Sequence, residues 1–174
     1  NDYTSGGTLH YQFDGFETHS LISSVSYKLD VHRENNKGEP VRVMSDHNLS
    51  ASIEDTWVAT PRLSLVSSSG FFFRGSLQAQ DFNASTGNIS DFPTNRDTAW
   101  NFLFAARYQI TEHDLIKFSA SSRTRFASVK DRYSYRLGQA IPNPGLSSER
   151  ANHLELDYNV RFAHYFQMES SIFY

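Results

Sequence analysis

The chain has 174 residues, a net charge of −3 and no cysteine. The weak charge and the lack of a basic stripe exclude the usual features of a nucleic-acid-binding protein, and disulfides and thiolate metal sites are excluded too. No apolar run is long enough for a transmembrane helix, so a crossing of a membrane would require β-strands. Residues 1–174 show no internal boundary or linker, and we interpret them as a single unit.

Eight segments in which apolar and polar residues alternate predict eight β-strands, because a period of two places alternate side chains on opposite faces. These strands are expected at residues 8–14, 19–33, 45–57, 63–76, 98–110, 115–127, 151–162 and 166–174. Their connections alternate between short turns and long polar loops, as they do in outer-membrane barrels. The sequence therefore predicts an all-β fold, an antiparallel up-and-down transmembrane β-barrel with about eight strands present.

The segment 151–162 shows the alternation most clearly. Leu154, Leu156, Tyr158 and Val160 share one parity, and Glu155, Asp157 and Arg161 share the other. An Arg or Lys that faces lipid at mid-depth costs about 2–4 kcal/mol, so the charged parity is expected to face a wet lumen. Across all strands the predicted lumen-facing residues are Lys28, Asp30, Glu54, Arg107, Lys117, Arg123, Glu155, Asp157 and Arg161.

Aromatic residues lie near the ends of the apolar parity. Trp57, Tyr108 and Phe162 are close to the short turns, and Trp100 is close to a long loop. Tyr and Trp are favoured at lipid–water boundaries because their rings are amphipathic. A membrane girdle is therefore expected, and the alternative is the core of a soluble β protein.

The stretch before the strand 151–162 resembles a known family. The run Ile141-Pro-Asn-Pro-Gly-Leu146 is followed by Glu149-Arg-Ala151 and then by Leu154-Glu-Leu-Asp-Tyr158. This order is similar to the Asn-Pro-x-Leu turn, Pro-Glu-Arg and Glu-Leu-Gly-Tyr strand of TonB-dependent outer-membrane receptors. The chain departs from that pattern at Gly145, Ser148 and Asp157, where an acidic or amide residue, Pro and Gly are usual.

The resemblance implies that the chain is a segment of a larger barrel of the 22-stranded type. It implies energised uptake of a scarce nutrient across the bacterial outer membrane, such as a ferric siderophore, cobalamin, haem or a glycan. The partners implied are outer-membrane lipid, the nutrient, a plug domain and TonB, and no plug is visible in this sequence. No cofactor is implied.

Two alternatives to the receptor remain open. One is a complete eight-stranded outer-membrane barrel with a structural or adhesive role, and the other is a soluble all-β carbohydrate-binding module. In a segment of a larger barrel, we expect the first and last strands to have unpaired edges. A ladder between residues 8–14 and 166–174 would instead indicate the small closed barrel.

The long loops carry aromatic and cationic side chains, a combination that suits anionic or aromatic ligands. The candidate ligand-binding residues are Phe92, Arg96, Tyr133, Tyr135 and Arg136. The alternative is that these side chains pack loop against loop. No catalytic residue and no metal site is predicted, because Glu112-His-Asp114 lies in a turn without a nucleophile nearby, so we do not expect an enzyme.

Overall fold

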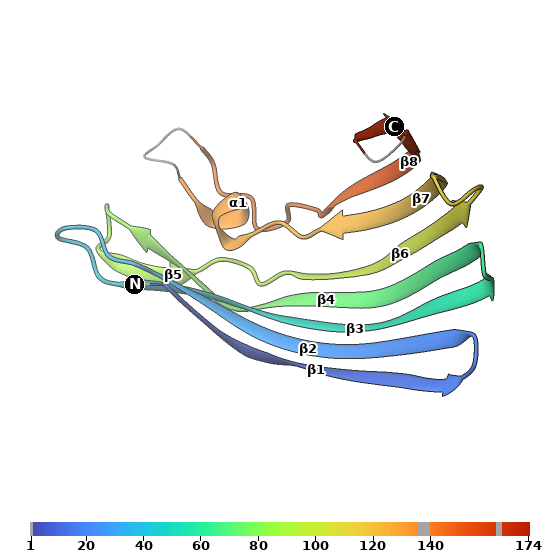
Figure 1. Cartoon of the computed structure of the whole chain (residues 1–174). Coiled ribbons are helices and arrows are strands. Elements are labelled where there is room, and N and C mark those ends of the chain that lie inside the picture. Colours follow the sequence, from blue (N-terminus) through green and yellow to red (C-terminus); the bar gives the residue numbers. More distant parts are fainter. Residues whose placement is uncertain (1, 136–139, 163–164) are drawn as a thin grey trace.

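The computed structural model describes residues 2–135, 140–162 and 165–174 as one curved antiparallel sheet with a short helix beside it. Figure 1 shows the strands running side by side and the helix α1 over the concave side of the sheet. The elements are β1 (Tyr3–Phe16), β2 (His19–Glu34), β3 (Arg42–Thr60), β4 (Leu63–Asn83), β5 (Asn88–Asp91), β6 (Arg96–Gln109), β7 (Asp114–Arg125), α1 (Val129–Tyr133), β8 (Glu149–Phe162) and β9 (Phe166–Phe173).

The strands follow the up-and-down order that the alternation predicts. The sheet order is β1-β2-β3-β4-β6-β7-β8-β9, and β5 forms a side hairpin with the end of β4. Every strand pair is antiparallel. The predicted all-β barrel fold is therefore confirmed.

The sheet is open rather than closed. Among the described residues, β1 pairs with β2, β9 pairs with β8, and no ladder joins β1 to β9. The two edges agree with the expectation for a barrel segment and disagree with a closed eight-stranded barrel. Separately, none of the helices in the described residues is long and apolar enough to span a bilayer.

The strand register assigns each residue to one of two faces, because directly opposed residues of antiparallel strands share a face. Asp46 of β3 contacts Arg132 of α1, so the face that carries Asp46 is the concave one. We call this face the inner wall; it also carries Arg74 and Lys117. The convex outer face carries Leu49, Phe102, Leu154 and their neighbours of the same parity.

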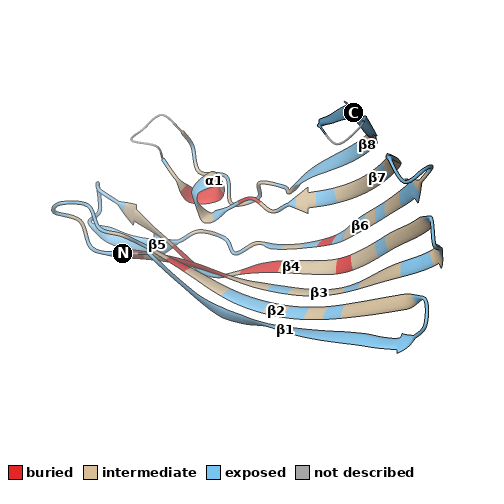
Figure 2. Cartoon of the chain, in the orientation of Figure 1, coloured by how far each residue is buried: buried red, intermediate tan, exposed pale blue. Residues whose placement is uncertain are grey.

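The outer face exposes a large apolar surface. Leu9, Ile53, Trp100, Phe102 and Leu154 are all exposed. The only cluster of buried apolar residues that the described part of the chain contains is small: Met44, Ala79 and Tyr133, with Phe92 and Val129 against it. Figure 2 shows that the buried residues concentrate near α1, while long stretches of the strands are exposed or only half-buried. Many large apolar residues of this sheet therefore face outward rather than into a core.

Two elements differ from the sequence prediction. We expected a long polar loop from residue 78 to 97, but β4 continues to Asn83 and pairs with β5. The turn between them is built by the Asn83 side chain, which accepts hydrogen bonds from the backbone N–H groups of Ser85 and Thr86, and by Gly87 at φ +73°. The second difference is α1, which lies in the region 128–150 that we expected to be a loop.

Candidate functional site on the inner wall

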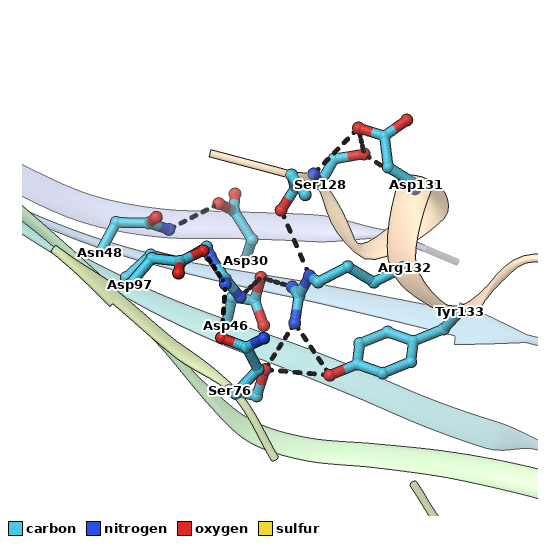
Figure 3. A network of polar contacts seen from close by, with 12 residues as sticks. Asp30, Asp46, Asn48, Ser76, Asp97, Ser128, Asp131, Arg132 and Tyr133 are labelled. Carbon is cyan, nitrogen blue, oxygen red and sulfur yellow. Dashed lines mark hydrogen bonds and ion pairs between the residues drawn. The ribbon is translucent and has the colours of Figure 1, made fainter. Parts of the chain in front are cut away.

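A buried arginine fastens α1 to the inner wall. Arg132 is 0% exposed, and its Nη2 donates to the carboxylate of Asp46 on β3. Its Nη1 donates to Ser76 Oγ of β4 at 2.6 Å and to the phenol oxygen of Tyr133 at 2.8 Å. Figure 3 shows these groups converging on the guanidinium. A buried charge needs a partner and hydrogen bonds, and the two strands supply both.

The pKa of Arg132 is lowered, chiefly because burial disfavours its charged form. The negative charge of Asp46 acts in the opposite direction. An arginine loses its proton only far above physiological pH, so the side chain stays charged and the ion pair persists. The contact between α1 and the wall is therefore an ion pair between Arg132 and Asp46.

A second arginine extends the network along the wall. Arg74 of β4 is 2% exposed, and its Nη2 donates to Asp97 of β6 at 2.6 Å and to Asn95 at 3.2 Å. Its Nη1 lies 3.7 Å from Asp46, within ion-pair range but beyond a hydrogen bond. Asp46 thus stands between two buried guanidinium groups, one from the wall and one from α1.

Some polar atoms of this network are not fully satisfied. Within the described ranges, Oδ1 of Asp46 and both Nε and Nη1 of Arg74 are buried without a hydrogen-bond partner. Such atoms cost free energy unless water or a ligand reaches them. A cavity of about 420 Å³ adjoins them, between the start of α1 and strands β1 to β3, and Asp46, Arg74, Lys28 and His32 are among its lining residues.

The sequence around α1 explains why a helix forms there. Ser128 is the N-cap: its hydroxyl accepts from the backbone N–H of Asp131, and the Asp131 carboxylate accepts from the backbone N–H of Ser128. This reciprocal arrangement is a capping box, which satisfies backbone donors that the first helical turn leaves unpaired. It starts the helix where its fourth and fifth residues, Arg132 and Tyr133, meet the wall.

The turn that resembles the receptor family is held against the same structure. The backbone N–H of Asn143 donates to the carbonyl of Arg132 at 2.7 Å. The carbonyl of Pro144 accepts from the side chain of Asn95 at 2.8 Å, and Asn95 itself accepts from Arg74. The Asn-Pro turn therefore closes the long loop onto α1 and onto the start of β6.

Three of the predicted ligand-binding residues lie together. The ring of Phe92 stacks on Tyr133 with centroids 5.3 Å apart, and it lies 6.5 Å from the ring of Tyr135. The Tyr135 hydroxyl donates to Asp81 at 2.9 Å. Arg96 is exposed at the first position of β6, and Arg136 lies outside the described residues. These contacts join the loop after β5 to the loop that carries α1.

The members of this aromatic group differ in what they can reach. Tyr133 is 1% exposed, and its ring packs between loops. Its hydroxyl forms hydrogen bonds with Arg132 and Ser76. Tyr135 is 41% exposed. Tyr133 therefore packs loop against loop, which is the alternative noted for these residues. Tyr135 and Arg96 lie on the accessible surface.

All nine predicted lumen-facing residues have the parity of the inner wall. Arg107 pairs with Lys117 and Lys117 with Asp157, while Arg123, Glu155 and Arg161 follow at even spacing along β7 and β8. On the other side, Lys28 and Asp30 pair with Asn48 and Asp46, and Glu54 follows at even spacing on β3. Leu154, by contrast, pairs with Ala120 on the outer face.

The residues that the sequence did not single out are Asp46, Ser76, Arg74, Asp97 and Asn95. Asp46 and Arg74 share the polar parity of their strands, so alternation placed them on the right face without indicating their burial. A sequence signal for the helix did exist, since Ser128 and Asp131 have capping-box spacing. In the part of the chain that is described, no three His, Asp or Glu residues are grouped as metal ligands.

The fold is similar to several solved transporters. The copper transporter OprC matches with a TM-score of 0.76 at 15% identity, covering 99% of this chain and 30% of that one. An FrpB iron transporter from Neisseria meningitidis (F3-3 variant) matches with a TM-score of 0.74 at 15% identity, covering 99% and 27%. The ferric yersiniabactin uptake receptor FyuA from Yersinia pestis matches with a TM-score of 0.70 at 14% identity, covering 99% and 28%.

The matches confirm the fold that the resemblance implied, an antiparallel β-sheet that forms a segment of a larger barrel. This chain spans less than a third of the length of those proteins. Comparison of the sequence with protein-family models and with curated proteins found no match.

Proposed function

We propose that the chain forms part of the wall of a TonB-dependent receptor that imports a scarce nutrient across the bacterial outer membrane. The observation that carries the proposal is the separation of the two faces. Large apolar side chains such as Leu9, Trp100 and Phe102 are exposed on the outer face, while most charged residues of the strands lie on the inner wall. A sheet of this kind needs hydrocarbon on one side and water on the other.

The same separation argues against a soluble carbohydrate-binding module. Monomeric soluble proteins rarely expose contiguous apolar patches larger than about 300–600 Å². Here apolar side chains continue across the outer face from Leu9 on β1 to Ile172 on β9. The aromatic residues Trp57, Tyr108 and Phe162, near the short turns, are also exposed, which suits a membrane–water boundary.

We propose a metal ion or metal chelate as the nutrient, ahead of cobalamin, haem or a glycan. The support is the printed identity of the structural neighbours: a copper transporter, an iron transporter and a ferric yersiniabactin receptor. The receptor role also implies a plug domain inside the barrel and TonB as the energy-coupling partner. The function proposed is transport, without catalysis.

Within the loops, Tyr135 and Arg96 are the proposed ligand contacts. Both are accessible, and both lie at the long-loop end. Phe92 supports them by packing on the buried Tyr133. A predicted contribution of Arg136 stays a prediction. Aromatic and guanidinium side chains are the kinds that suit an anionic or aromatic chelate.

The test is uptake in the bacterium that carries the gene. Deletion of the gene should lower accumulation of one metal, supplied free or as a chelate, under metal limitation. Arg96→Ala and Tyr135→Ala should weaken ligand binding to the purified full-length protein, because recognition commonly sits on loops over a rigid scaffold. Lys37→Ala, an exposed charge in another loop at the same end, is the matched control and should bind normally.

Two results would contradict the proposal. Unchanged accumulation of every metal and chelate after deletion of the gene would contradict the proposal that the nutrient is a metal ion or metal chelate. A purified protein that stays folded and monodisperse without detergent would remove the membrane barrel itself.

A further inference from the structure

The outer face carries a groove that the transport proposal does not use. Its volume is about 740 Å³, within the range of about 300–1,000 Å³ that small-molecule sites occupy. Its apolar lining includes Ile53, Phe102 and Leu154. Ser67 and Ser69 of β4 lie between these larger side chains, because Ser69 pairs with Ile53 on one side and with Phe102 on the other. Small side chains flanked by large ones hollow the surface there.

An ionisable pair lies at one end of this groove. Asp55 lines it, and the Asp55 carboxylate is 2.9 Å from Nδ1 of His19 on the neighbouring strand. The His19 ring stacks on Trp57, with centroids 5.5 Å apart and planes 5° apart. Asp55 and Trp57 both have outer-face parity, since they pair with Leu21 and His19 of β2. The pair therefore lies on the apolar side of the sheet, toward the short turns.

The position of the Asp55 carboxylate on the apolar outer face needs a physical explanation. Ionisable groups exposed to hydrocarbon are costly and usually mark functional sites with a specific partner. The neighbouring Glu54 meets no such cost, because it lies on the inner wall. The Asp55 carboxylate shares a hydrogen bond with Nδ1 of His19, and that contact keeps the carboxylate in place on the outer face.

We propose that this groove binds one phospholipid with a zwitterionic ethanolamine headgroup. The ammonium group meets the Asp55 carboxylate, and an acyl chain lies in the groove over Ser67. Charge complementarity selects this occupant, because the Asp55 carboxylate on the apolar face matches the cationic ammonium of the headgroup. An anionic headgroup without an ammonium would place negative charge against Asp55. The inference rests on the proposed function, which puts the outer face in a membrane.

The position of the site fits a lipid of the inner leaflet. Asp55 is close to the turn at residues 61–62, and short turns of outer-membrane barrels are periplasmic. Trp57 lies between Asp55 and that turn, where Trp is favoured at the lipid–water boundary. The headgroup would thus lie at the boundary, with its chain directed along the groove.

Native mass spectrometry of the full-length protein, released from detergent micelles, tests the site. Phosphatidylethanolamine and phosphatidylglycerol with identical acyl chains are added in equal amounts to delipidated protein. The wild type should retain one phosphatidylethanolamine in preference. Asp55→Asn should lower that retention about tenfold, the loss expected for a hydrogen bond to a charged group. Ser67→Phe should fill the groove and lower retention of both lipids.

Glu54→Gln is the matched control, since it removes a carboxylate one residue away on the opposite face, and it should retain lipid as the wild type does. Circular dichroism verifies that each variant keeps its strands. Equal retention of the two lipids by the wild type, or wild-type retention by both Asp55→Asn and Ser67→Phe, would overturn the lipid site and leave the barrel intact. Protein that stays monodisperse without detergent would instead overturn the proposed function, and the lipid site with it.

Discussion

The charged residues at the two ends of the inner wall differ in how far they are buried. At the long-loop end, Asp46 and Arg74 are buried beneath α1 and form ion pairs. At the short-turn end, Arg107 and Arg161 are exposed around a hollow of about 460 Å³. Both sets have the same strand parity, and both are equally polar. The difference arises because a loop folds over one end and, in the residues described, none folds over the other.

This contrast separates two uses of charge on one surface. Buried charges must be paired, so the loop-end set fixes the position of α1 and makes it sensitive to single substitutions. Exposed charges interact weakly through water, so the short-turn set is expected to have little effect on stability. The following variants test whether the distinction holds.

The largest effect is expected for Arg132→Met. The variant leaves Asp46 buried with less compensation, and breaking a buried ion pair costs about 3–5 kcal/mol. The lower end is expected, because Arg74 remains 3.7 Å from Asp46. Hydrogen exchange of backbone amides at residues 129–133 should show that α1 detaches while the strands stay protected. Lys130→Met, an exposed cation on the same helix, should leave exchange unchanged. Equal protection in the two variants would contradict the anchoring role.

A smaller effect is expected for Tyr133→Phe. The substitution keeps the ring that stacks on Phe92 and removes the hydroxyl that contacts Arg132 and Ser76. Loss of such a contact costs about 1 kcal/mol, so the amides of α1 should exchange several-fold faster. Tyr108→Phe removes a hydroxyl from an exposed residue of the outer face and serves as the control. Full protection of α1 in Tyr133→Phe would show that the hydroxyl contributes nothing.

A pH-dependent effect is expected at Tyr135. Burial and the hydrogen bond to Asp81 raise the pKa of the Tyr135 hydroxyl. The folded loop therefore prefers the neutral phenol, and this stabilisation is fully present below the unfolded pKa of about 10 and is lost as pH rises through the raised folded value. The loop should become more sensitive to an alkali-tolerant protease above about pH 10. Tyr135→Phe should remove this step, and an identical alkaline profile in the variant would contradict it.

The smallest effect is expected for Arg107→Gln at the short-turn end. Arg107 lies directly across from Lys117, and like charges in that position repel. Its removal should change the free energy of unfolding by less than about 0.5 kcal/mol, measured by urea denaturation in detergent. Arg74→Gln, the same substitution on the same wall but in a buried position, should be several times more destabilising. Similar values for the two would remove the distinction between the ends.

The sequence predicted the sheet because its signal is local. Leu154 and Glu155 are neighbours on opposite faces, and a period of two is enough to separate them. The same argument placed Lys117, Asp157 and Arg107 on one face before their pairing was known. The short turns were predictable for the same reason, since they lie where alternation stops.

The buried network was not predictable because it is not local. Nothing in the neighbourhood of Asp46 indicates that a guanidinium from a distant loop covers it. Alternation reports the face of a residue and not what lies above that face, so Arg74 and Arg107 looked alike. The capping-box spacing of Ser128 and Asp131 is visible in the sequence, but it predicts where the helix starts and not where the helix docks.

The separation in sequence between Asp46 and Arg132 has a consequence for assembly. Strands of the main sheet pair with their neighbours along the chain, with β5 as a side hairpin, so the paired strands are adjacent in sequence. The ion pair between Asp46 and Arg132 joins residues 86 positions apart. Contacts between distant residues form late, because the loop they close must first be shortened by structure in between. Docking of α1 is therefore expected after β3 to β7 are paired, so that these strands form before the loop is fastened to them.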